Sequence, residues 1–504
     1  MLAMRPHLRS VWARLPGGGS AFWLAPVMAL AGLLRLFRIG ANSLWFDEAF
    51  SWLVAQQPAW SILTQRLEPI LPPLYHFLLH FWIRLGQGEV VLRSFSAFCG
   101  LLTIPLMYVL GRELFSPAGG LAAALLMAVL PFHVYFAQEA RLYALVVLLS
   151  ALMLWGFVRS WRASGYRPWV GLGLLCALSL YTHYFAVFSM ATFHLFALLS
   201  RPHDRCRWQG LLLSDLVALG LVAPLLPSAW VQTRQVTADF WLSPPSPLEP
   251  FKTLDYLLFS HTTPIPLVPV ALFVTLSTLT LVIWAAVRSQ GVERRWLLLL
   301  VGLMLVPIFS ALLLSWVLGP VYLDRSFSLV TPAYVLLLGW GVSHPLRGSP
   351  LPLLYGGLGF LVVISLGNHY LNPDSAKPPF RDVGVVVREG WQEGDVLFHL
   401  HDSSYLPLIY YAPQMDSYLL NNDPHAWLPA STWKWAGRRV SSLDEMVVGK
   451  SRLWLALMPG RVSDQQAEAL DQVEASYERV GQWTWPALDS VELRLYSLGD
   501  VCQP

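Results

Sequence analysis

Two adjacent carboxylates, Asp47 and Glu48, are the strongest candidates for chemistry in this sequence. They lie in the segment Ser43 to Phe50, SLWFDEAF, soon after the first long apolar run, Ala21 to Ile39. If that run crosses a bilayer, both carboxylates lie just outside the membrane, where they can stay ionised and still reach a group embedded in lipid. Such a carboxylate suits a base that acts on a lipid-linked substrate, although the pair alone also fits an acidic loop in solvent.

Other polar side chains occur in the short segments that separate later apolar runs. The segment after Asp47 adds Glu68 and His76. The remaining candidates are Gln138, Glu139, Arg141 and Tyr143 in AQEARLY, His183 and Tyr184 in YTHYF, and Arg325 in GPVYLDRSF.

The arginines in these segments do not all have the same interpretation. Arg141 and Arg325 have acidic and aromatic neighbours on the predicted face of Asp47, which favours a functional role. Arg35 and Arg38 fit better as anchors whose charged ends reach the membrane interface. A histidine within an apolar run, such as His194, is best explained as a hydrogen bonder between helices.

Composition indicates a polytopic membrane protein. Of the 504 residues, 55% are hydrophobic and 13% charged, and the mean hydropathy is +0.50. Soluble domains usually have about a quarter of their residues charged. The net charge of +3 is too small to argue for a nucleic acid partner. The four cysteines show no CxxC spacing, so neither a disulfide framework nor a zinc site is indicated.

About 11 apolar segments are candidates for membrane-spanning helices, although several fall short of the ~20 residues that a span needs. Together they predict a transmembrane domain over residues 1–367. The segments are Ala21–Ile39, Leu92–Leu110, Ala118–Phe136, Arg141–Val158, Trp169–Tyr181, Phe185–Leu199, Leu211–Trp230, Ile265–Val287, Trp296–Leu318, Leu329–Val342 and Leu351–Leu366.

Loop charge sets the predicted orientation. With the N-terminus inside, nearly all basic clusters fall in inside loops, for example Arg159, Arg162 and Arg167, as the positive-inside rule expects. The apolar segment Pro72–Leu85 would reverse this pattern if it crossed the membrane, so we predict an amphipathic helix in the outer interface. We therefore expect a multi-pass protein of the plasma (inner) membrane, with Asp47 on the extracytoplasmic side.

The C-terminal region, residues 368–504, has the composition of a soluble domain. Short apolar strands are expected at Asp395–Leu400, Arg452–Met458 and Glu492–Leu498, with a helix at Ser463–Tyr477. This pattern predicts a small α/β domain. Because the predicted number of spans is odd, the domain is expected on the same outer side as Asp47.

Several segments, taken in order, resemble the integral membrane glycosyltransferases of the GT-C type. The likeness runs from about Leu30 to about Leu366. It is closest to the branch that includes protein O-mannosyltransferases and the lipid A aminoarabinose transferase. The Glu-Lys-Pro of the aminoarabinose transferases is replaced by Leu67-Glu68-Pro69, and QEARLY differs from the acidic signature of the mannosyltransferases. The segments that carry the likeness are WFDEAFS, PPLYHFLLHFW, QEARLYAL, YTHYF and YLDRSFSLVTP.

The resemblance implies transfer of one sugar, with inversion, from a polyprenyl-phosphate donor to a lipid, protein or glycan acceptor on the outer side. Asp47 would be the base, and Arg141 and Arg325 would bind the phosphate. Three acidic residues, Glu48, Glu68 and Glu139, would orient the sugar or the base. Other substrate contacts are expected from His76, Gln138, Tyr143, His183 and Tyr184, with membrane lipids as further partners.

A cofactor is not required by this chemistry. Asp47 and Glu48 could hold Mg²⁺ or Mn²⁺, but no further carboxylate at a fixed spacing demands a metal. A transporter would show internal repeats and ionisable groups near mid-membrane, which the sequence lacks. A lipid-binding protein without catalytic activity would not need Asp47. Both remain alternatives to the transferase.

Overall fold

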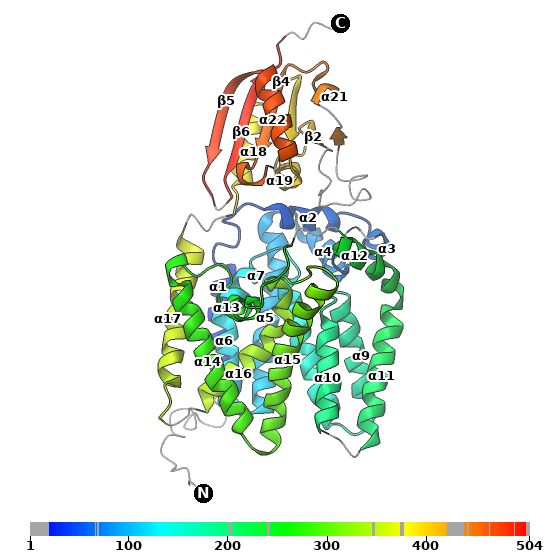
Figure 1. Ribbon diagram of the computed structural model, residues 1–504, viewed down its shortest axis with the longest axis vertical. Coiled ribbons are helices and arrows are strands. Elements are labelled where there is room, and N and C mark those ends of the chain that lie inside the picture. Colours follow the sequence, from blue (N-terminus) through cyan, green and yellow to red (C-terminus); the bar gives the residue numbers. More distant parts are fainter. Residues whose placement is uncertain are drawn as a thin grey trace. The chain divides into compact units, whose positions relative to one another are not determined.

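The computed structural model describes residues 20–65, 67, 70–200, 204–238, 242–344, 348–372, 377–420, 438–440, 443–462, 464–487 and 489–499. These residues form two compact units (Figure 1). The first comprises the described residues within Met1–Phe37, Ile70–Tyr75 and Ser94–Tyr370. The second comprises those within Arg38–Pro69, His76–Arg93 and Leu371–Pro504. The acidic segment at Asp47 therefore belongs to the same unit as the C-terminal region.

The first unit is helical. Its connections include the 3₁₀ helix η5 (Asp324–Val330). Helix α5 begins in the second unit and continues into the first. The helices are α1 (Ser20–Leu36), α5 (Glu89–Leu114), α6 (Pro117–Val129), α7 (Pro131–Ala137), α8 (Tyr143–Arg162), α9 (Arg167–Leu180), α10 (Ala186–Ser200), α11 (Arg205–Val222), α12 (Leu226–Ala238), α13 (Glu249–Phe259), α14 (Val268–Arg288), α15 (Gly291–Val317), α16 (Thr331–Ser343) and α17 (Leu351–Leu371).

Among the described residues, seven helices are long and apolar enough to cross a membrane, and the bent pair α6 and α7 would make an eighth. Three shorter apolar helices cover Phe22–Leu36, Arg167–Leu180 and Ala186–Ser200. Each apolar segment that the sequence indicates thus falls on a helix or helix pair. The exact number of spans stays a prediction, because the shorter helices fall below the length of a full span.

The segment that contains Pro244–Pro250 is partly helical. Helix α13 begins at Glu249 and continues to Phe259, with Leu254, Leu257 and Leu258 buried. Pro250 lies in the first turn, where a missing N–H costs nothing.

A bend of 56° separates α6 from α7. Leu130 is extended and Pro131 follows it, so the chain leaves α6 and starts a new helix. Arg35 of α1 donates to two carbonyls at the end of α6, Ala128 O at 2.9 Å and Met127 O at 3.0 Å. Its guanidinium also lies 2.7 Å from Nδ1 of His133 on α7.

Arg35 is fully buried, so the interpretation of this residue as an interfacial anchor was wrong. An anchor would place its charge in water. Arg35 instead supplies hydrogen bonds to carbonyls that the end of α6 leaves without helical partners. It thereby fixes the direction in which α7 leads to the AQEARLY turn.

The second unit combines short helices with one sheet. Its strand order is β3-β2-β1-β4-β6-β5, with parallel pairing from β3 through β4 and antiparallel pairing of β4 with β6 and of β6 with β5. The elements are α2 (Phe46–Ala55), α3 (Ala59–Thr64), α4 (Leu74–Trp82), η2 (Ile83–Leu85), α18 (Phe380–Gly390), β1 (Asp395–His399), α19 (Asp402–Tyr411), β2 (Ser417–Leu420), β3 (Arg438–Val440), α21 (Leu443–Val447), β4 (Arg452–Leu457), η7 (Pro459–Arg461), α22 (Asp464–Ser476), β5 (Glu478–Trp485) and β6 (Val491–Ser497).

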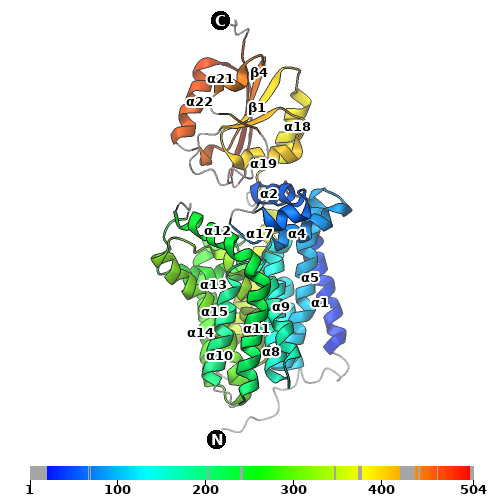
Figure 2. The same ribbon diagram turned by 90° about the vertical axis from the view of Figure 1, so that its right-hand side faces the viewer.

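Helices cover both faces of this sheet, as Figure 2 shows. On one face, α18 and α19 pack Val383 and Leu408 against Leu397. On the other, α21 and α22 pack Met446 and Val473 against the opposite side. The central strand β1 is buried along its whole length, which is typical of a parallel strand covered on both sides. The expected α/β fold, with three of its strands and one helix, is confirmed to within one or two residues at each end.

Helix α19 also packs against α2. Phe50 and Leu53 of α2 share a buried cluster with Tyr405 and Leu406 of α19. The helix predicted in Pro72–Leu85 is present as α4, and its Phe77 packs on the same cluster. The acidic segment and the C-terminal region are therefore joined by a common apolar core, which the sequence analysis did not anticipate.

We expect Arg35→Met to destabilise the protein, because two buried carbonyls of α6 would lose their donors. Leaving buried polar groups unsatisfied costs on the order of 1–3 kcal/mol each, so we expect a clear fall in Tm. Thermal unfolding of the purified protein measures it. Arg84→Met, which removes an exposed arginine, is the control. Equal Tm values for the two variants would contradict the role assigned to Arg35.

Candidate functional site

Asp47 and Glu48 both lie in the first turn of α2. Trp45 precedes the helix in an extended conformation, without a side-chain cap. The partial positive charge at a helix N-terminus favours the ionised form of carboxylates in this position. Both side chains are buried: Asp47 is 9% exposed and Glu48 is 0% exposed. A buried carboxylate needs compensation, and the contacts of Glu48 supply it.

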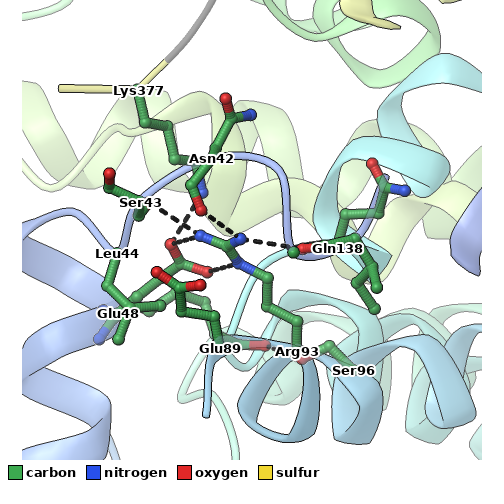
Figure 3. Close-up of polar contacts among 12 residues, drawn as sticks. Asn42, Ser43, Leu44, Glu48, Glu89, Arg93, Ser96, Gln138 and Lys377 are labelled. Atoms are coloured by element: carbon green, nitrogen blue, oxygen red, sulfur yellow. Dashed lines mark hydrogen bonds and ion pairs between the residues drawn. The ribbon is translucent and has the colours of Figure 1, made fainter. Parts of the chain in front are cut away.

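Glu48 forms a buried ion pair with Arg93 of α5, as Figure 3 shows. Arg93 Nε donates to Glu48 Oε1 and Nη2 to Oε2, both at 2.8 Å. Lys377 Nζ donates to the same Oε2 at 3.1 Å. We call this group, Glu48 with Arg93 and Lys377, the Glu48 clasp. Arg93 also donates to the carbonyls of Ile39 (2.9 Å), Asn42 (2.7 Å) and Ser43 (2.9 Å).

A second polar network, formed with residues of the C-terminal region, fixes the loop between α1 and α2. Arg381 Nε donates to Glu89 Oε1 at 3.1 Å, and its Nη2 donates to the carbonyl of Gly40 at 2.8 Å. Tyr411 donates to Glu89 and accepts from Leu44 N at 2.7 Å. Burial and the bond to Glu89 raise the pKa of the Tyr411 phenol, so it stays protonated. The loop before Asp47 is therefore fixed by two charged networks.

Arg93, Lys377 and Arg381 were not among the candidates from sequence. Arg93 carried a usable signal, because an arginine near the start of an apolar helix must find a partner. Lys377 and Arg381 carried none, since they lie about 330 residues from the acidic pair and in an ordinary polar segment. Only the tertiary structure brings them to Glu48 and Glu89.

A metal at the acidic pair would have to compete with these cations. Both oxygens of Glu48 already accept hydrogen bonds from Arg93, and one also accepts from Lys377. Within the described part of the chain, no group of three or more His, Cys, Asp and Glu side chains is placed to hold a metal ion. The option of Mg²⁺ or Mn²⁺ therefore gains no support from Glu48.

His76 lies on α4 and is 1% exposed. Its ring meets the ring of Phe50 edge to face, with centroids 6.1 Å apart. His76 thus shares the apolar surroundings of α2 with the acidic pair. Glu68, the other candidate of this segment, lies outside the described residues.

The AQEARLY turn lies between α7 and α8 and is tied to the end of α1. Gln138 Nε2 donates to three carbonyls there, including Phe37 O at 2.8 Å, and so caps groups that the helix end leaves unpaired. Glu139 and Arg141 are 2% and 5% exposed. Ser96 Oγ donates to Arg141 O at 3.0 Å. Ser96 lies on α5, which thus holds the backbone of this turn within the first unit.

Arg325 and Tyr143 are brought together in the first unit. The guanidinium of Arg325 lies 5.8 Å from the centroid of the Tyr143 ring, within the range of a cation–π contact. Tyr143 is the first residue of α8, and Arg325 lies in η5. The structure therefore places two of the candidate substrate contacts from distant segments side by side.

His183 lies in the short link between α9 and α10 and lines a small pocket. Its Nδ1 accepts from Phe185 N at 3.2 Å. Burial lowers the pKa of His183 to about 4, so the ring is neutral near pH 7. Tyr184 instead donates to Gln232 Oε1 of α12. The pocket is lined by Val146, Leu149, Ser150, Ser179, Thr182, His183, Ala186 and Leu329.

Comparison with known proteins finds similarity in both sequence and structure. A family model described as dolichyl-phosphate-mannose-protein mannosyltransferase matches residues 71–228. No curated protein sequence matches the chain.

Solved structures match over most of the chain. The apo structure of ArnT from Cupriavidus metallidurans has 13% identity and a TM-score of 0.63, covering 95% of this chain and 98% of that one. ArnT bound to undecaprenyl phosphate has 13% identity and a TM-score of 0.61, covering 96% and 99%. The apo oligosaccharyltransferase of Archaeoglobus fulgidus has 11% identity and a TM-score of 0.54, covering 94% and 74%. At these identities the likeness shows a shared fold.

We expect Glu48→Ala to lower stability strongly, because Arg93 would remain buried without its counter-ion. Removing one partner of a buried pair typically costs about 3–5 kcal/mol. The Tm of the purified protein reports the loss. Glu249→Ala breaks the exposed pair with Lys252, which should cost less than ~1 kcal/mol, and is the matched control. Similar Tm values for both variants would show that the clasp is not structural.

His183 should contribute a pH-dependent stability. Its folded pKa of about 4 lies below the unfolded value of about 6.5, so the unfolded state binds more protons between these values. The stabilisation is complete above pH 6.5 and is lost as pH falls toward 4, by roughly 3 kcal/mol in all. Tm measured from pH 7 to 4.5 should fall less in His183→Gln than in the wild type. An equal fall in both proteins would contradict this role of His183.

Proposed function

Because the chain shares the fold of the GT-C type integral membrane glycosyltransferases, we propose that it transfers a single sugar from a polyprenyl-phosphate donor to an acceptor. The observation that carries this proposal is the structural match over 96% of the chain to ArnT bound to undecaprenyl phosphate. The match of residues 71–228 to the family model for dolichyl-phosphate-mannose-protein mannosyltransferase supports the same class of donor. The acceptor is a lipid, a protein or a glycan.

Asp47 is the proposed base. Glu48 is a poorer candidate, because proton transfer to it would have to displace Arg93 or Lys377. The N-terminal turn of α2 favours the ionised carboxylate that a base needs. In the proposed reaction, an acceptor hydroxyl attacks the anomeric carbon and gives its proton to Asp47. The bond from that carbon to the phosphate oxygen breaks, polyprenyl phosphate leaves, and the configuration inverts.

The leaving phosphate needs cations. We assign this role to Arg141 and Arg325, whose guanidinium groups can form paired hydrogen bonds with phosphate oxygens. The contact of Arg325 with Tyr143 supports the assignment, because it orients the guanidinium group. Glu139 and His183 are proposed to bind sugar hydroxyls, and Glu48 acts as a positioning residue. We propose that the reaction occurs on the extracytoplasmic side of the inner membrane, with residues 1–367 as the membrane domain and 368–504 outside.

We expect Asp47→Asn to reduce sugar transfer by roughly 10²–10⁴-fold, the usual contribution of a general base. The variant should keep its Tm and still co-purify with a polyprenyl-phosphate sugar, as native mass spectrometry would show. Glu249→Gln, an acidic change at an exposed ion pair, should leave transfer unchanged. A transporter or a lipid-binding protein without catalytic activity would show no transfer to lose. Full transfer by a folded Asp47→Asn protein would exclude Asp47 as the base.

A further inference from the structure

The sheet of the second unit contains a topological switch point at the carboxyl ends of β1 and β4. These two strands are parallel neighbours in the centre of the sheet. The chain leaves β1 for α19, which covers one face, and leaves β4 for α22, which covers the opposite face. In open α/β sheets, ligands bind outside the carboxyl ends of strands at such a point.

Two buried polar side chains lie at this edge of the sheet. His399 is the last residue of β1 and is fully buried, and Asp402 is the first residue of α19 and is 4% exposed. Neither Nε2 of His399 nor the carboxylate of Asp402 receives a hydrogen bond from any residue that the structure describes. Buried groups of this kind are rare in folded proteins, because each costs stability.

Two backbone carbonyls can accept the single hydrogen of Ser404 Oγ, that of Ala456 at 3.2 Å and that of His401 at 3.1 Å. We therefore assign the ring hydrogen of His399 to Nδ1, which then donates to Ser404 Oγ at 3.1 Å. This tautomer leaves a lone pair on Nε2. Burial lowers the pKa of His399 to about 3, which keeps the ring neutral.

The neighbouring His401 does not donate a hydrogen bond to the Asp402 carboxylate. Nδ1 of His401 lies 2.9 Å from Asp402 Oδ1, which would be an ion pair if that nitrogen carried a proton. The same nitrogen accepts the amide of Ser403 at 3.0 Å, so it presents a lone pair instead. The Asp402 oxygens and His399 Nε2 therefore form a set of acceptors without donors.

We propose that the carboxyl edge of β1 and β4 is a binding site for a saccharide, whose hydroxyl groups donate to Asp402 and to Nε2 of His399. Hydroxyls suit a set that combines one carboxylate with a neutral acceptor. Metal binding is disfavoured, since within the described residues no three potential ligands are placed to coordinate an ion.

This site is separate from the chemistry assigned to Asp47, because it depends only on residues of the C-terminal α/β fold. A saccharide held here would be part of an acceptor, a product or a neighbouring envelope glycan. The inference therefore goes beyond the proposed transfer reaction.

Binding can be measured by saturation-transfer NMR on the intact protein in nanodiscs, which avoids detergents with sugar headgroups. The probes are the methyl glycosides of mannose, glucose and galactose, with spermidine as a cationic comparison. We expect at least one glycoside to bind, and Asp402→Asn to weaken that binding at least tenfold. Asp402→Asn should also raise Tm, because it removes an unpaired buried carboxylate, whereas a purely structural Asp402 would lower it. Asp489→Asn, which alters an exposed ion pair with Arg461, is the control.

Unchanged glycoside binding in Asp402→Asn would overturn the proposal, as would a failure of all three glycosides to bind. Binding of spermidine alone would replace the saccharide by a cationic ligand. Asp47→Asn is expected to bind glycosides like the wild type, so the saccharide site and the transfer reaction can fail independently.

Discussion

The ion pair between Glu48 and Arg93 is the constraint on which the acidic segment depends. Both side chains are almost inaccessible to solvent, and taking two charges out of water is costly unless the geometry is good. The geometry meets this condition, since two hydrogen bonds of 2.8 Å join the groups and backbone carbonyls take the remaining donors of Arg93. The pair therefore fixes where α2 begins, and with it the position of Asp47.

Helix α5 extends this constraint along the chain. Arg93 holds the loop before α2, and Ser96, one turn later, holds the backbone of Arg141. Each of these contacts orders a segment of its own unit. The C-terminal region adds Lys377 and Arg381, so residues from three distant parts of the chain determine the environment of one carboxylate pair. Preorganisation of this kind is what a base in a dry site requires.

Local patterns predicted most of the elements but few of their contacts. The strands at Asp395 and Arg452 were recognisable as short apolar runs that alternate with helical stretches, and the apolar helices were recognisable from their length. Arg35 was misassigned, since sequence spacing cannot distinguish an arginine that reaches water from one that caps a helix end. Lys377 was missed because an ion pair across 329 residues leaves no periodic signal. Arg93, 45 residues from Glu48, was missed although its position near the start of an apolar helix was informative. The roles of Asp47, Arg141 and Arg325 stay predictions.

Two buried carboxylates of the second unit, Asp395 and Asp402, differ in their hydrogen-bond partners. Asp395 accepts from Arg452 at 2.6 and 2.8 Å and from Trp454 at 2.8 Å, so its charge is matched and serves the fold. Asp402 lies beyond the other end of the same strand and, among the described residues, receives no comparable donor. A fold that can satisfy one carboxylate so fully gains nothing in stability from leaving the other unmatched. The difference is best explained by a ligand that supplies the missing donors.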